Sequence, residues 1–147
     1  MAVVDLRHRE SGSVLLLVPA GILIVIALGA IAVNGAMAFQ GERRAANLAS
    51  LVANDTATLA LDTEHFRATG DYALVDDVSA AAERAIDAAL SGGGGGFTDG
   101  SIDVRVERID DASVRVVVTA EVPVLWRAPG AGSSTRVEAT AIATAAP

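Results

Sequence analysis

The longest uninterrupted pattern in the chain is apolar and lies near its amino end. No side chain between Glu10 and Glu42 carries a charge, and residues 14–33 are apolar except for two glycines and one proline. Twenty helical residues rise about 30 Å, which is the thickness of the hydrocarbon core of a bilayer. The pattern predicts a transmembrane helix over residues 13–40, preceded by a short cytoplasmic arm over residues 1–12.

A cleavable secretory signal is the other interpretation of this run. Arg7 and Arg9 form a basic start, and Ala36-Met37-Ala38 has the small residues of a cleavage site. Signal sequences have apolar regions of roughly 7–15 residues, and this one is longer. We therefore expect a retained anchor. The alternative is a secreted soluble binding module that signal peptidase releases after Ala38.

Helical periodicity continues past the apolar run and predicts a helical stem over residues 41–61. Small side chains recur every four residues on one face of this stem. Two more small residues with the same spacing lie in the uncharged segment before it. Small residues allow a second surface to approach a helix closely, so this stripe is a predicted packing face. Helical self-association and packing on the chain's own sheet both fit it. The stripe consists of Ala32, Ala36, Ala45, Ala49, Ala53 and Ala57.

The remaining residues, 62–147, predict a small α+β head. Residues 62–72 have the composition of a loop, with Gly70 as a helix breaker. A second, amphipathic helix is expected between an acidic cap and Gly92. A run of five glycines then predicts a flexible linker over residues 91–101. The acidic cap is expected among Asp71, Asp76 and Asp77, and the apolar face at Val78, Ala82, Ile86 and Leu90.

Alternating apolar and polar residues over residues 102–109, 113–126 and 136–145 predict three strands. We expect a three-stranded antiparallel sheet that covers the second helix and has two open edges, at which other chains can pair. Pro123 cannot donate to a strand ladder, so the end of this strand should lie at an edge or leave the sheet. The apolar face should carry Ile102, Val104, Val106, Val114, Val116, Val118, Ala120, Val122, Val124, Val137, Ala139, Ala141 and Ala143.

Composition excludes several classes of function. The net charge is −7, and all eleven basic residues are arginines. An acidic excess repels phosphate backbones, so nucleic acid is not an expected partner. The chain has no cysteine, which rules out disulfides, thiolate metal sites and acylation of a lipoprotein cysteine.

The candidate chemistry is sparse. His65 stands beside Glu64 with no second histidine at metal-ligand spacing, and a solvated surface histidine is the simpler interpretation. The pairs Asp76-Asp77 and Asp110-Asp111 suit a helix cap and a tight turn. We therefore expect no enzyme activity, no cofactor, no metal and no small-molecule substrate.

Three segments together resemble the TadE/TadG-like family, the minor pilin-like proteins of the bacterial Tad (Flp-type) pilus and secretion machinery. They are an apolar run that opens with Gly-Ser, the helix "RRAANLASLVANDTATLAL" and the closing pattern "VRVVVTAEVPVLW…VEATAIATAAP". The resemblance implies a single-pass membrane protein with an extracytoplasmic head and a role in pilus assembly beside other pilin-like subunits. The longer TadG-type relatives carry a D-x-S-x-S adhesion motif that this chain lacks, which favours a short TadE-like form.

The resemblance also implies processing by a prepilin peptidase, with a cut between Gly12 and Ser13. Prepilins usually have Glu at the fifth mature position, and here that position is Leu17.

The positive charges flanking the apolar run are nearly balanced, but His8 and the free amine favour a cytoplasmic amino terminus.

Overall fold

The computed structural model describes residues 11–92, 96–127 and 132–145, with side chains from Leu17 onward. The fold is α+β, as the sequence predicts: a long apolar helix packs on a three-stranded antiparallel sheet, accompanied by two shorter helices. The first element, α1 (Ser11–Leu59), has 49 residues and is therefore about 74 Å long. The predicted transmembrane and stem segments are one continuous helix.

The second helix, α2 (Thr63–Thr69), shows that the loop predicted for residues 62–72 was wrong. The Asp62 carboxylate accepts hydrogen bonds from the backbone N–H groups of Glu64 and His65, at 3.0 and 2.9 Å. At the other end Gly70 has φ +83°, a left-handed conformation that ends the helix. Gly70 was identified from the sequence as a helix breaker, but the cap at Asp62 and the seven-residue helix between them were not.

The third helix, α3 (Ser79–Ser91), lies where the second amphipathic helix was predicted. The predicted acidic cap was wrong, because the N-cap is Val78 and has no side-chain cap hydrogen bond. Asp77, one residue earlier, accepts a hydrogen bond from the Ser79 N–H at 2.9 Å. The predicted apolar face was wrong in part, because Leu90 is exposed and Ile86 only half-buried. This helix packs on α1 through small residues, which permit a closer approach than leucine does. Its buried side chains are Ala81, Ala82, Ala85 and Ala89.

The three predicted strands are present as β1 (Asp103–Arg108), β2 (Ser113–Pro123) and β3 (Ser134–Thr144). They form an antiparallel meander in the order β1-β2-β3. Pro123 is the last residue of β2, which therefore ends three residues before the predicted limit at residue 126. On the inner face valines of β2 lie opposite alanines of β3, for example Val116 opposite Ala141 and Val118 opposite Ala139.

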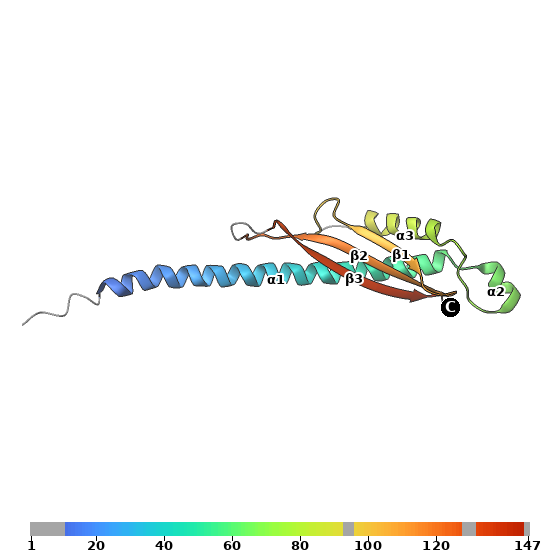
Figure 1. Ribbon diagram of the computed structural model, residues 1–147, viewed down its shortest axis with the longest axis horizontal. Helices are drawn as coiled ribbons and strands as arrows, with labels where there is room; N and C mark the ends of the chain where they lie inside the picture. The colour runs from blue at the N-terminus through green and yellow to red at the C-terminus, as the bar shows by residue number, and fades with distance from the viewer. Residues whose placement is uncertain (1–10, 93–95, 128–131, 146–147) are drawn as a thin grey trace, which may run out of the picture.

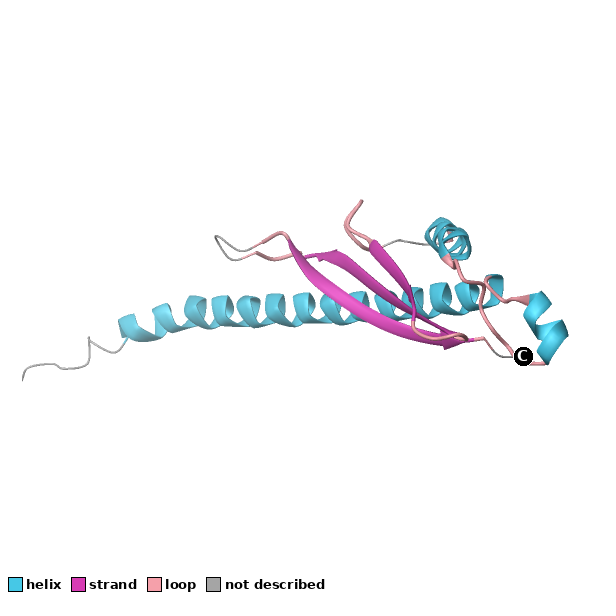
Figure 2. Ribbon diagram, turned by 45° about the vertical axis from the view of Figure 1, so that its right-hand side comes forward, coloured by secondary structure: helices cyan, strands magenta, loops and turns pink. Residues whose placement is uncertain are grey.

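The sheet packs chiefly on α1, which corrects the expectation that it covers the second helix. Strands β2 and β3 cross the C-terminal half of α1, and α3 lies beside α1 near β1 (Figures 1 and 2). The stripe of small residues is longer on α1 than on α3. Because the inner face of the sheet also carries small side chains, α1 can make more close contacts with it than α3 can. Ala45, Ala49 and Val52 of α1 are fully buried in this core, as are Val114 and Val116 of β2.

Gly41 marks the closest approach of α1 to the sheet. A Cβ added at this residue would collide with Cγ2 of Val122, so the valine side chain or the backbone would have to move. Glycine is therefore required at this position by packing, although it is an unfavourable helix residue. Gly35, six residues earlier on the same helix, has no atom within 4 Å of its added Cβ.

We predict that Gly41→Leu destabilises the head by about 1–3 kcal/mol, the usual cost of overpacking a core. Gly35→Leu is the matched control, because it adds the same side chain to the same helix in open space. Thermal unfolding of the detergent-solubilised chain, followed by circular dichroism, measures both. Equal midpoints for the two variants would contradict the close contact between Gly41 and Val122.

Candidate functional site

The N-terminal half of α1 projects beyond the head and exposes its apolar side chains (Figure 1). An 18-residue window of this helix has a mean hydropathy of 2.4, and none of it is buried. Length and composition suit a membrane anchor, and an N-terminal signal sequence shares both properties. The exposed large side chains are Leu17, Val18, Ile22, Leu23, Ile24, Val25, Ile26, Leu28, Ile31, Val33 and Phe39.

The predicted stripe of small residues divides into two parts. Its later members lie in the core, where they contact the chain's own sheet and α3, so packing within the chain accounts for them. Its earlier members, Ala32 and Ala36, are exposed on the projecting half of α1. Only this earlier pair is available to another molecule. The buried members are Ala45, Ala49, Ala53 and Ala57.

Gly12 and Ser13, the residues of the implied processing site, lie in the first turn of α1, which begins at Ser11. Their side chains and residues 1–10 fall outside the described part of the chain. Processing between them stays a prediction.

The segment after β2 returns along the projecting half of α1. The Asn34 side chain forms two hydrogen bonds with the backbone of Trp126: its Nδ2 donates to the carbonyl oxygen at 2.8 Å, and its Oδ1 accepts from the N–H at 3.4 Å. Leu125 and Trp126 thereby border an open groove of about 280 Å³ beside the helix. Sequence reasoning missed this contact, because its partners are 92 positions apart and no local pattern joins them.

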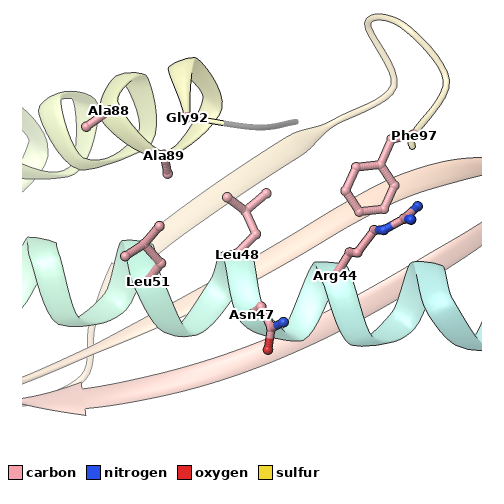
Figure 3. A pocket seen from close by; sticks show the side chains of 8 residues that line it. All are labelled: Arg44, Asn47, Leu48, Leu51, Ala88, Ala89, Gly92 and Phe97. Atoms are coloured by element: carbon pink, nitrogen blue, oxygen red, sulfur yellow. The ribbon is translucent and has the colours of Figure 1, made fainter. Parts of the chain in front are cut away.

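A second open groove, of about 330 Å³, lies between α1 and α3 (Figure 3). Its walls are mostly apolar, with Leu48 and Leu51 on α1, and Arg44 and Phe97 lie at one end. The Arg44 guanidinium lies so close to Gly96 that an added Cβ there would be 2.0 Å from Nη1. Among the described residues that line this groove, the polar side chains are the guanidinium of Arg44 and the amide of Asn47.

The titratable groups of the head have structural roles. Hydrogen bonds from Ser79 lower the pKa of Asp77, and hydrogen bonds from Ala112 and Ser113 lower the pKa of Asp110. Both carboxylates are exposed: Asp77 bonds the first residue of α3, and Asp110 accepts from the Ala112 N–H in the turn between β1 and β2. Arg108 bridges Asp76 and Asp111 at 3.2 and 3.0 Å. Within the described ranges, no group of three metal-ligating side chains converges.

No family model, curated protein or solved structure matches the chain. The architecture itself is pilin-like, since a long N-terminal apolar helix is followed by a three-stranded antiparallel sheet that packs on its C-terminal half. The candidate functional site is therefore a set of surfaces. It comprises the projecting half of α1, the groove beside Trp126 and the outer edges of β1 and β3.

Proposed function

We propose that the chain is a membrane-anchored, non-enzymatic, pilin-like accessory subunit of a Tad/Flp-type pilus or secretion system. The observation that carries this proposal is the continuity of α1. The first half of this helix exposes apolar side chains from Leu17 onward. Its second half packs on the sheet and contributes buried residues to the core of the head. A helix of this kind places the head directly at a membrane surface, with no flexible linker between anchor and head.

The proposed orientation has the amino terminus in the cytoplasm and the head outside. The proposed partners are the membrane and other pilin-like subunits. Because the later part of the alanine stripe is occupied within the chain, contacts with other subunits would use Ala32 and Ala36 together with the sheet edges. Strands β1 and β3 are both edge strands, and an open edge offers unpaired backbone groups to another chain.

A structural role without catalysis is supported by the surroundings of the charged groups. The exposed face of the sheet carries charges of alternating sign, such as Arg105 with Asp103 at 3.2 Å and Arg115 with Glu107 at 3.5 Å. These ion pairs are exposed, and Asp103 and Arg105 border an open polar pocket of about 290 Å³ together with Glu121, Arg136 and Glu138. Carboxylates and guanidinium groups mix there in solvent, an arrangement that suits a solvated sheet surface.

The secreted binding module remains the alternative, and the position of the core explains why. Within the described residues, every buried residue of α1 lies at Gly41 or beyond. A cut after Ala38 would therefore leave the helix–sheet core of the head in the released product. The two proposals differ in the fate of the first 38 residues.

We predict that Ile24→Arg weakens membrane insertion, because an arginine at the centre of a membrane helix costs about 2.5–3.5 kcal/mol. Ile24 is 60% exposed and does not contribute to the buried core. Alkaline extraction of membranes should release more of this variant than of the unmodified chain. Ile142→Arg is the matched control, since Ile142 is 59% exposed on the head and this change should leave retention unaltered. Unchanged retention of Ile24→Arg would contradict the anchor.

The assignment to a Tad-type system makes a separate prediction about the genes that surround this one. A Tad-type ATPase and a prepilin peptidase should be encoded nearby, because an accessory subunit acts only with the rest of its machinery. Sequencing of the flanking DNA checks this. A locus that encodes neither protein would count against the Tad assignment while leaving the anchor intact.

A further inference from the structure

Leu125 and Trp126 are large apolar residues that the head does not use for its core. They follow the end of β2, and their side chains are 66% and 58% exposed. Both line the groove beside α1, whose other walls are Ile26, Gly29, Ala30, Val33 and Asn34. The groove is therefore continuous with the exposed apolar surface of the projecting helix.

The position of this groove along α1 overlaps the predicted membrane span. Ile26 precedes Asn34 by eight residues, which corresponds to about 12 Å along the helix axis. The apolar run over residues 14–33 ends at Val33, so the segment after β2 lies against the last two turns of that run. Tryptophan is enriched at this level of membranes, because its ring is apolar and its indole N–H still reaches polar groups.

The contact with Asn34 provides partners for the backbone of Trp126 at that depth. Backbone N–H and C=O groups within a bilayer need hydrogen-bond partners, because lipid supplies none. The Asn34 carboxamide is bonded to both backbone groups of Trp126, at 2.8 and 3.4 Å. The Val124 N–H donates to the Ser133 carbonyl oxygen at 3.0 Å. The same pair of bonds satisfies the polar side chain of Asn34.

We propose that Leu125 and Trp126 form a second membrane contact, with Trp126 at the boundary between headgroups and acyl chains on the side of the head. The occupant of the groove is lipid. Apart from the amide of Asn34, which Trp126 already engages, the described residues that line the groove present apolar side chains and backbone, the kind of surface that acyl chains contact. This inference rests on the proposed membrane anchor. Two contacts would fix how the head is rotated relative to the bilayer.

Trp126 is the only tryptophan of the chain and reports its own surroundings. The experiment uses the full-length chain reconstituted into phosphatidylcholine vesicles, with or without acyl chains brominated near the headgroup. We expect brominated lipid to quench Trp126 fluorescence and aqueous iodide to quench it weakly. Strong quenching by iodide and none by brominated lipid, in vesicles that retain the chain after an alkaline wash, would overturn the second contact and leave the anchor standing.

The other outcomes are equally decisive. Protection from both quenchers would mean that protein, for example a second copy of the chain, covers the groove, and this would overturn the lipid assignment. Loss of the chain from the vesicles during the alkaline wash would overturn the anchor, and the inference with it.

A matched pair of variants tests the role of Asn34. Asn34→Ala removes the amide that holds the Trp126 backbone, so quenching by brominated lipid should fall and quenching by iodide should rise. Asn54→Ala removes an exposed amide of the same helix and should behave as the unmodified chain. Far-ultraviolet circular dichroism shows whether the head of each variant is folded. Identical quenching in the two folded variants would overturn the proposed role of Asn34.

Discussion

The close contact between α1 and the sheet is the interaction on which the rest of the structure depends. The core contains mostly alanine and valine, which bury little apolar area each, so it gains stability only if many such residues pack at short range. Glycine at position 41 and alanines at positions 45 and 49 allow the helix backbone to approach β2. Alanines of β3, opposite the valines of β2, provide the matching space on the sheet. Disulfides cannot replace this contact, because the chain has no cysteine.

The same helix connects the core of the head to the proposed anchor. Helix α1 is continuous from its exposed N-terminal half to its buried C-terminal half. The packing of the C-terminal half on the sheet therefore fixes the direction in which the N-terminal half projects. A head held in this way would present the edges of β1 and β3 in a defined orientation to neighbouring subunits. The hydrogen bonds between Asn34 and Trp126 add a point of attachment beyond the core, where the helix would enter the membrane.

The periodicity of apolar residues within one helix or strand could be predicted from the sequence. Contacts between elements far apart in the chain could not. Alternation predicted the three strands, and the faces of β2 and β3 followed from the same period of two. The periodicity of the stem identified Ala45 and Ala49 as a packing face but left its partner open, because a small residue suits a helix and a sheet equally well. The close approach at Gly41 and the contact between Asn34 and Trp126 depend on how the chain folds back on itself, which no local pattern records.

The intact mass of the chain recovered from producing cells tests the central claim most directly, because that claim requires the apolar half of α1 to remain attached to the head. The account predicts a membrane-bound polypeptide that retains residues 14–33, either complete or shortened by the twelve residues before Ser13. A soluble polypeptide in the medium that begins at Phe39 would contradict it.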